Sequence, residues 1–199
     1  MLPPILPHLR FDAFLDTPTR AALLDWTLAN SARFVPAQLM RGVVDTDVRR
    51  SLTLRDLGPL AAVLETRLRE AASHWSAALR STPFVTSEVE LELAAHNDGA
   101  HFTLHTDTYA SNEVARGDRM LSAVYYFHRT PRGFDGGALR LHRLGAKAGD
   151  AGHDIAPDDN SLVVFPSWGP HEVMPVRCPS GDFADSRFAV NCWIYRARR

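Results

Sequence analysis

The length, composition and charge of the chain indicate one ordinary globular domain. Its 199 residues can bury a core without disulfides or a structural metal, and leave little room for a second full domain. Hydrophobic residues make up 45% and charged residues 23%, with a formal net charge of -1, so neither nucleic acid nor an anionic membrane is expected as a partner.

The N-terminus carries no recognisable targeting signal. The segment Met1 to Pro7 has no basic region before its apolar residues, and its prolines would break a signal-peptide helix. No apolar run is long enough to span a bilayer. We therefore expect a cytoplasmic protein. Cys178 and Cys192 are too few for a disulfide framework and are predicted to be free thiols, with a single bridge as the alternative.

Residues 1–86 are predicted to form a helical support region. Thr17 and Pro18 have the character of an N-cap followed by proline at the first helical position, and apolar spacing continues to Ala29. A second helix is predicted over residues 59–80, whose apolar residues recur every three or four positions. Its stripe consists of Leu60, Leu64, Leu68, Ala71, Trp75 and Leu79. Such a helix should pack against a sheet.

The segment between these helices, residues 41–56, is polar and only weakly periodic. We interpret it as a loop. It could close over a site, or it could equally be an ordinary solvated surface loop.

From Ser87 onward the pattern changes to short strands. Val89, Leu91 and Leu93 alternate with glutamates, which predicts a half-buried strand with one face in water. Further strands are predicted over residues 120–127, 138–144, 161–165, 172–176 and 187–195. Glycine, proline and aspartate separate them. Residues 87–199 should therefore form an all-β sandwich or barrel, which the helices of the same single domain support.

One histidine-rich pattern suggests a metal site. His105 and Asp107 are two residues apart, so on an extended segment both side chains project to the same side. His171, at the start of a later strand, could supply a second imidazole. Two histidines and one carboxylate leave three open positions on an octahedral iron(II), whereas structural zinc would need a closed fourth ligand. Taken alone, the His-Thr-Asp triplet fits a surface turn at least as well.

The last strand strengthens the case for a site. Arg187, Ala189, Asn191 and Trp193 share one of its faces, which has the composition of a polar pocket wall. Arginine is well suited to gripping a carboxylate through two parallel hydrogen bonds.

With these residues in view, the part of the chain from Glu88 to Tyr195 resembles the catalytic domain of the iron(II)/2-oxoglutarate-dependent dioxygenases, in their prolyl-4-hydroxylase-like branch. The segments that carry the resemblance are Asn97–Asp107, Arg119–Phe127, Gly136–Leu139, Leu162–Ser167, His171–Val176 and Arg187–Trp193. Their order and spacing match the family. The resemblance implies a mainly β fold, with a double-stranded β-helix (jelly-roll) core and N-terminal helices that buttress it.

The resemblance also implies roles for individual residues. The iron(II) ligands would be His105, Asp107 and His171. Arg187 would bind the distal carboxylate of 2-oxoglutarate, and the hydroxyl of Tyr126 would help to hold it. Asn191 and Trp193 match positions that line the pocket near the co-substrate.

Two departures from the family pattern stand out. His96 occupies a position where many relatives have a tyrosine facing the metal pocket, and residues 178–185 lengthen the gap between His171 and Arg187. Tyr109 and Trp168 are further candidates for contact with substrate. For Tyr109 the alternative is a solvated loop, and for Trp168 a packed turn.

The sequence therefore predicts a hydroxylase that uses Fe(II), 2-oxoglutarate and O₂, with ascorbate as an accompanying reductant. Its substrate would be a peptide or small molecule: a prolyl residue, a free amino acid or a natural-product intermediate. The alternative is a catalytically inactive or differently metallated binding protein on the same barrel.

Overall fold

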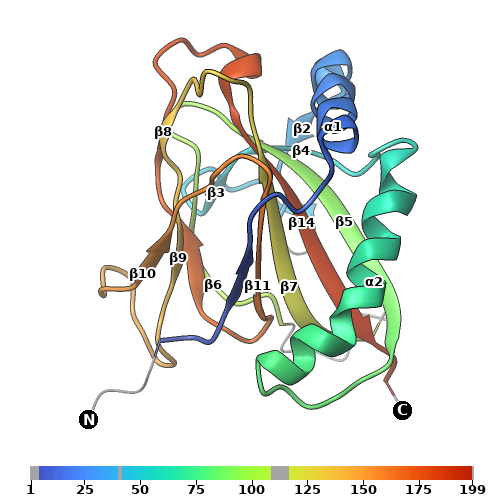
Figure 1. Cartoon of the computed structure of the whole chain (residues 1–199). Coiled ribbons are helices and arrows are strands. Elements are labelled where there is room, and N and C mark those ends of the chain that lie inside the picture. The colour runs from blue at the N-terminus through green and yellow to red at the C-terminus, as the bar shows by residue number, and fades with distance from the viewer. Residues whose placement is uncertain (1–4, 40–41, 109–116, 199) are drawn as a thin grey trace.

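Two facing antiparallel sheets form the centre of the protein, and two helices cover the outer face of the larger one (Figure 1). This computed structural model describes residues 5–39, 42–108 and 117–198. The prediction of a mainly β fold is confirmed.

The larger sheet contains the longest strands. Its strands are, in spatial order, β1 (Leu9–Phe11), β11 (Ser161–Pro166), β7 (Asp118–Phe127), β14 (Arg187–Arg196), β5 (Thr86–His96), β4 (Leu52–Leu54) and β2 (Val35–Pro36). The last strand in the sequence, β14, lies between β5 and β7 and pairs with both along nearly its whole length. Residues far apart in the sequence therefore meet at the centre of this sheet.

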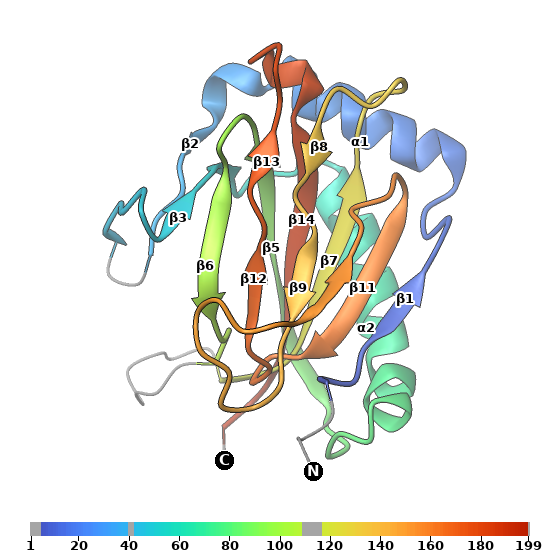
Figure 2. The same cartoon turned by 90° about the vertical axis from the view of Figure 1, so that its left-hand side faces the viewer.

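The smaller sheet carries the other half of the barrel. Its strands are, in order, β10 (His153–Ile155), β9 (Leu139–Leu141), β12 (His171–Val173), β6 (His101–His105) and β3 (Arg49–Arg50). A separate pair joins β13 (Val176–Arg177) to β8 (Asp135–Gly136). Figure 2 looks onto this smaller sheet, with the helices behind the larger one.

Both predicted helices are present. In α1 (Thr17–Ala29) the N-cap is Asp16, whose carboxylate accepts the Thr19 N–H at 2.9 Å, so the prediction of Thr17 as the cap is wrong by one residue. The second helix, α2 (Leu60–Ala78), buries Leu64, Leu68 and Trp75 as the apolar stripe predicts. No helix in the described ranges is long and apolar enough to cross a membrane.

Alternation along the central strands separates two cores. Val190 and Ile194 belong to the outer core between the larger sheet and the helices, together with Leu64 of α2. Ala189 instead faces inward and packs with Leu139 of the smaller sheet. The face assignment made from the β14 sequence is thus confirmed. Cys178 and Cys192 are both buried and free, as predicted.

The N-terminal part of the chain differs from its predicted helical character. Residues 1–86 contribute four short strands as well as the two helices, and β3 and β4 lie within the segment 41–56 that was predicted to be a loop. These strands are two or three residues long, too short to show a period of two. The strands β3 and β4 form because each pairs with a longer strand, β3 with β6 and β4 with β5. Position 41 lies outside the described residues.

The sequence predicts that the glutamate face of β5 is in contact with water, but in the structure this face is largely buried. Glu90 and Glu92 are 9% and 4% exposed and face the inside of the barrel. Arg49 Nη2 lies 2.6 Å from Glu92 Oε1, and the Tyr195 hydroxyl donates to Glu90 at 2.5 Å. Burial acts to raise the pKa of Glu90, but Tyr195 and neighbouring arginines outweigh it and hold that pKa below its ordinary value. The two carboxylates are tolerated inside because each has a cationic partner.

The outer core should dominate the stability of the fold. Leu64 is 1% exposed in the interface between α2 and the larger sheet. Leu64→Ala is expected to lower the free energy of unfolding by about 2–5 kcal/mol, because it removes buried methyl groups and leaves a cavity. Val63→Ala, at a neighbouring position that is 38% exposed, is the control and should change it by less than about 0.5 kcal/mol. Chemical denaturation measures both, and equal losses would contradict this packing.

Candidate active site

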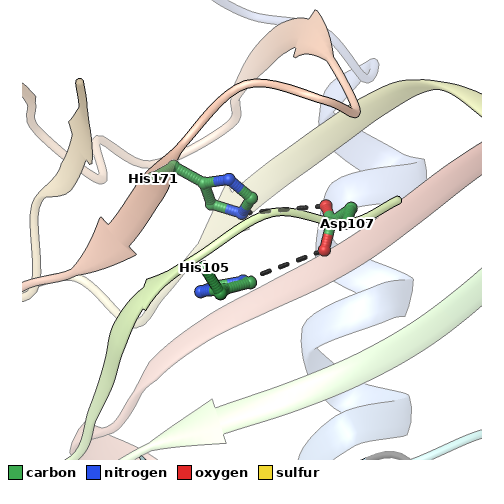
Figure 3. Close-up of side chains that lie close together, drawn as sticks. All are labelled: His105, Asp107 and His171. Atoms are coloured by element: carbon green, nitrogen blue, oxygen red, sulfur yellow. Dashed lines mark ion pairs between the residues drawn. The ribbon is translucent and has the colours of Figure 1, made fainter. Parts of the chain in front are cut away.

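Three potential metal ligands converge between the two sheets (Figure 3). His105 ends β6 and lies opposite His171, the first residue of β12, in the register of these paired strands. Asp107 follows two residues after His105. Its Oδ1 lies 3.8 Å from His105 Nε2, and its Oδ2 lies 3.7 Å from His171 Nε2. The three ligand atoms are all within 4.8 Å of one another.

Backbone carbonyls orient both imidazoles. His105 Nδ1 lies 2.7 Å from the Thr103 carbonyl oxygen, and His171 Nδ1 lies 2.9 Å from that of Gly169. Because a carbonyl oxygen can only accept, Nδ1 carries the proton in each ring. The lone pair of each Nε2 then faces Asp107 and is available to a metal.

Packing and charge keep these groups in forms that bind cations. Phe102 stacks on His105 with ring centroids 3.6 Å apart. Burial, followed by the proximity of His171, lowers the pKa of His105 to about 3, so the imidazole is neutral at pH 7. Burial acts to raise the pKa of Asp107, but the two histidines and a hydrogen bond from Ser122 outweigh it and hold that pKa below its ordinary value. Asp107 is therefore ionised.

This donor set fits an octahedral divalent ion with open positions. Two imidazole nitrogens and one carboxylate suit non-haem Fe(II) and leave room for further ligands. Among the described residues, no second group of three or more histidine, cysteine or acidic side chains comes close enough together to hold a metal ion.

A buried cation lies in the same pocket. Arg187, the first residue of β14, is 1% exposed, and its side chain and that of Tyr126 line the pocket with the three potential ligands. Its guanidinium carbon is 4.8 Å from the Tyr126 ring centroid. Arg187 Nη1 donates to His96 Nδ1 at 3.2 Å. Since Arg187 can only donate, His96 is held there as a neutral acceptor. Burial, together with the charges of Arg187 and Arg49, lowers the pKa of His96 well below its ordinary value.

Two polar atoms in this part of the pocket have no partner. The Tyr126 hydroxyl and Arg187 Nε are fully buried and make no hydrogen bond within the described part of the chain. No described carboxylate forms an ion pair with Arg187, and burial lowers the pKa of its guanidinium. A buried unpaired cation is costly. One end of a dicarboxylate such as 2-oxoglutarate would satisfy both atoms, so the pocket fits that co-substrate.

The remaining predicted residues divide into three groups. Asn191 and Trp193 line the same pocket, with Asn191 Nδ2 3.4 Å from Glu92 Oε1. Trp168 is 44% exposed and is not among the residues that line it. Tyr109 lies outside the described residues.

Several side chains of this pocket are not predicted by the sequence. Arg49 belongs to the segment 41–56, which the sequence predicts to be a loop, yet it lines the pocket and pairs with Glu92. Ser122 contacts Asp107 directly. The alternation of β7 carried a usable signal, because Ser122 and Val124 share the face of Tyr126.

The segment 178–185 is attached to the rest of the fold by hydrogen bonds, among them those of Asn97 to the Asp182 carbonyl oxygen and of the Cys178 N–H to Asp98. It ends in a 3₁₀ turn, Phe183–Asp185. The Phe183 ring lies 5.1 Å from that of Phe34 and 5.3 Å from that of Phe188. Phe183 therefore covers part of the outer core, and no residue of the segment 178–185 lines the pocket.

Comparison with known families supports the same interpretation. The model of the 2OG-Fe(II) oxygenase superfamily matches residues 91–195. The chain belongs to this superfamily. The match runs from β5 to β14 and so includes the potential metal ligands, Tyr126 and Arg187. The family implies Fe(II) and 2-oxoglutarate, as the sequence resemblance predicted.

One sequence relative is an uncharacterized PKHD-type hydroxylase of Synechocystis sp. strain PCC 6803. It is 38% identical over 140 residues, which are 68% of this chain. The aligned part spans only 45% of that protein's length.

Solved structures of prolyl hydroxylases share the fold. A prolyl-4-hydroxylase of Pseudomonas putida has a TM-score of 0.71 and 23% identity, covering 97% of this chain and 94% of that one. A prolyl hydroxylase of Trichoplax adhaerens, in complex with a peptide fragment of hypoxia inducible factor, has a TM-score of 0.66 and 20% identity over 94% and 83% of the two chains. The predicted double-stranded β-helix, in its prolyl-4-hydroxylase-like form, is thus confirmed.

The metal site makes a direct prediction. Replacing His105, Asp107 or His171 by alanine should lower Fe(II) or Mn(II) affinity by at least about ten-fold, because each change removes one ligand. The protein should stay folded, since strand pairing holds these positions. Anaerobic calorimetric titration measures the affinity. His153→Ala, an exposed histidine outside the site, is the control. Wild-type affinity in any of the three variants would remove that residue from the ligand set.

Proposed function

We propose that this protein is an Fe(II)- and 2-oxoglutarate-dependent hydroxylase that acts on a C–H bond of a peptide or small-molecule substrate, with O₂ as second co-substrate and ascorbate as a reductant. The observation that carries the proposal is the buried Arg187, which has no acidic partner in the described chain and shares one pocket with His105, Asp107 and His171. Metal binding by the three ligands does not by itself account for this buried cation.

Each residue of the pocket has a defined task in this scheme. His105, Asp107 and His171 would hold Fe(II). Arg187 Nε and the Tyr126 hydroxyl would bind the distal carboxylate of 2-oxoglutarate, which leaves its keto-acid end directed at the metal. His96 would fix the guanidinium through Nη1. When bound, Fe(II), 2-oxoglutarate and O₂ supply the oxidising power for hydroxylation, and the co-substrate leaves as succinate and CO₂.

The enclosed character of the pocket serves the same chemistry. Leu139 and Val173 of the smaller sheet and Val124 of the larger sheet line it together with the polar groups. With the co-substrate bound, these apolar walls would help to exclude water and would strengthen the electrostatic attraction of Arg187 for a carboxylate. Asn191 and Trp193 lie on the same face of β14 as Arg187, further along the strand. We propose that they line the pocket near the co-substrate.

For the substrate, a prolyl residue in a peptide is the first candidate. Support comes from the family branch and from the related structures, one of which holds a peptide fragment. A free amino acid and a small natural-product intermediate are the other candidates. Trp168, exposed three residues before His171, is a candidate contact for such a substrate.

The test of the function is a substrate panel. Proline-containing peptides, free amino acids and small metabolites are incubated with the protein, Fe(II), ascorbate and 2-oxoglutarate. A mass gain of one oxygen in one class, with equimolar succinate, is the expected result, and Asp107→Ala should abolish both. Metal binding without succinate formation, with or without any member of the panel, would instead support the inactive or differently metallated binding protein.

The co-substrate assignment gives a prediction with two opposing effects. Arg187→Met should lower 2-oxoglutarate affinity by roughly thirty-fold or more, because losing one member of a buried charge pair costs about 2–5 kcal/mol. The same change should leave the free energy of unfolding unchanged or raise it by up to about 4 kcal/mol, because it replaces an unpaired buried cation by an apolar side chain of similar size. Anaerobic titration and chemical denaturation measure the two effects.

Two milder variants complete this series. Arg187→Lys keeps the charge without the two-pronged geometry and should retain part of the affinity. Tyr126→Phe removes one hydrogen bond to a charged group and should cost about 1.5–3 kcal/mol of binding. If Arg187→Met loses stability and keeps its 2-oxoglutarate affinity, the arginine is structural and the assignment is wrong.

A further inference from the structure

A chain of two buried serine hydroxyls ends on the carboxylate of Asp107. Ser122 of β7 donates its Oγ proton to Asp107 Oδ2 at 2.6 Å. The Oγ of Ser167, just after β11, lies 2.9 Å from that of Ser122. The two serines are 1% and 0% exposed. Each hydroxyl has one proton, and Ser122 gives its own to the carboxylate, so Ser167 donates to Ser122. The direction of the chain is therefore fixed from Ser167 to Asp107.

The same serine also holds the backbone of Asp107. The Asp107 N–H donates to the Ser167 carbonyl oxygen at 2.9 Å, and the Ser167 N–H donates to that of Met120 at 3.2 Å. Asp107 itself belongs to the segment that follows β6 of the smaller sheet. Its main chain and its side chain are thus both attached to the end of β7 and β11 in the larger sheet.

The serine chain forms a hydrogen bond with only one of the two carboxylate oxygens of Asp107. Oδ2 accepts a short hydrogen bond, of the charge-assisted kind that is stronger than a neutral one. A second hydroxyl behind the first polarises it further. This bond uses a lone pair of Oδ2 and withdraws charge from it. Both oxygens border the site, with Oδ1 3.8 Å from His105 Nε2 and Oδ2 3.7 Å from His171 Nε2. The hydrogen bond from Ser122 falls on Oδ2, so Oδ1 is the oxygen left with more negative charge for a cation.

We propose that Ser122 and Ser167 are positioning residues that keep Asp107 a one-oxygen ligand. The inference rests on the proposed function, because it concerns a metal held by His105, Asp107 and His171. With one carboxylate oxygen and two imidazoles bound, an octahedral ion has three open positions, enough for a two-pronged keto acid and O₂. A carboxylate bound through both oxygens would leave two, which the keto acid alone would fill. The serine chain thus reserves the position that O₂ requires.

The experiment uses Mn(II) as the probe, in the full chain without 2-oxoglutarate. Water fills the open positions of the bound ion, and water-proton relaxation measures how many exchangeable waters it holds. Ser122→Ala should hold one fewer water per ion, because Asp107 is free to bind through both oxygens. Ser122→Thr keeps the hydroxyl and should restore the wild-type number. Ser167→Ala, which removes the donor to Ser122, should lie between the two.

A matched control separates this effect from the loss of any buried serine hydroxyl. Ser76 of α2 is 1% exposed, and its hydroxyl donates to the Ala72 carbonyl oxygen at 2.9 Å on the far side of the larger sheet. Ser76→Ala should keep the wild-type water number and Mn(II) affinity. Thermal melting confirms that each variant is folded. If Ser122→Ala does not fold, Ser167→Ala decides alone.

The outcomes distinguish this inference from the function on which it rests. A wild-type water number in folded Ser122→Ala and Ser167→Ala overturns the positioning role, while the metal site itself stands if Asp107→Ala loses Mn(II). Equal Mn(II) binding in the wild type and in Asp107→Ala removes Asp107 from the ligand set, and the serine inference with it.

Discussion

The antiparallel pairing of β6 with β12 is the constraint on which the site depends. It places His105 opposite His171, although the two are 66 positions apart in the sequence. A one-residue slip in this register would turn one imidazole to the other face of the sheet and remove it from the pocket. Gly169 and Thr103 then fix the two rings through their carbonyl oxygens. The geometry of the potential metal site is therefore a property of strand pairing.

A second constraint comes from charge inside the barrel. The inner face of the larger sheet carries Glu90, Glu92 and Arg187, all nearly excluded from water. The two glutamates have arginine partners, such as Arg49 for Glu92, so their charges are compensated within the protein. Arg187 has a neutral histidine as its partner instead. This contrast is the basis of the proposal that the carboxylate of a ligand binds at Arg187.

The division of the barrel into two cores explains how these polar groups are tolerated. The outer core, between the helices and the larger sheet, contains most of the buried hydrophobic residues of the described chain, including Leu64, Leu93 and Val190. The inner side can then hold a smaller apolar cluster around Leu139 and leave space for polar groups. Stability and chemistry are thus carried by opposite faces of the same strands, since successive side chains of a strand alternate between them.

The sequence by itself determined the features that depend on local period and on residue type. It gave the apolar stripe of α2, the two faces of β14 and, through the order of its motifs, the family and most of the candidate residues that line one pocket. Trp168 is a candidate that does not line it. The prediction for the glutamate face of β5 was wrong. Alternation of apolar residues with glutamate is the pattern of a strand with one face in water, and the arginines that neutralise these glutamates lie elsewhere in the chain, where the local pattern does not reveal them. Arg49 lies 43 residues from Glu92.

Only the tertiary structure decided which distant residues meet. Strands as short as β3 and β4 carry no periodic signal and exist because longer strands offer them hydrogen-bonding partners. The contact of Ser122 with Asp107 joins two segments across a sheet boundary, and serine is common enough that no local pattern marks it. The lack of an acidic partner for Arg187 among the described residues likewise depends on every group around it. These contacts join residues that are distant in the sequence, so no local pattern of residues predicts them and they become visible only in the folded chain.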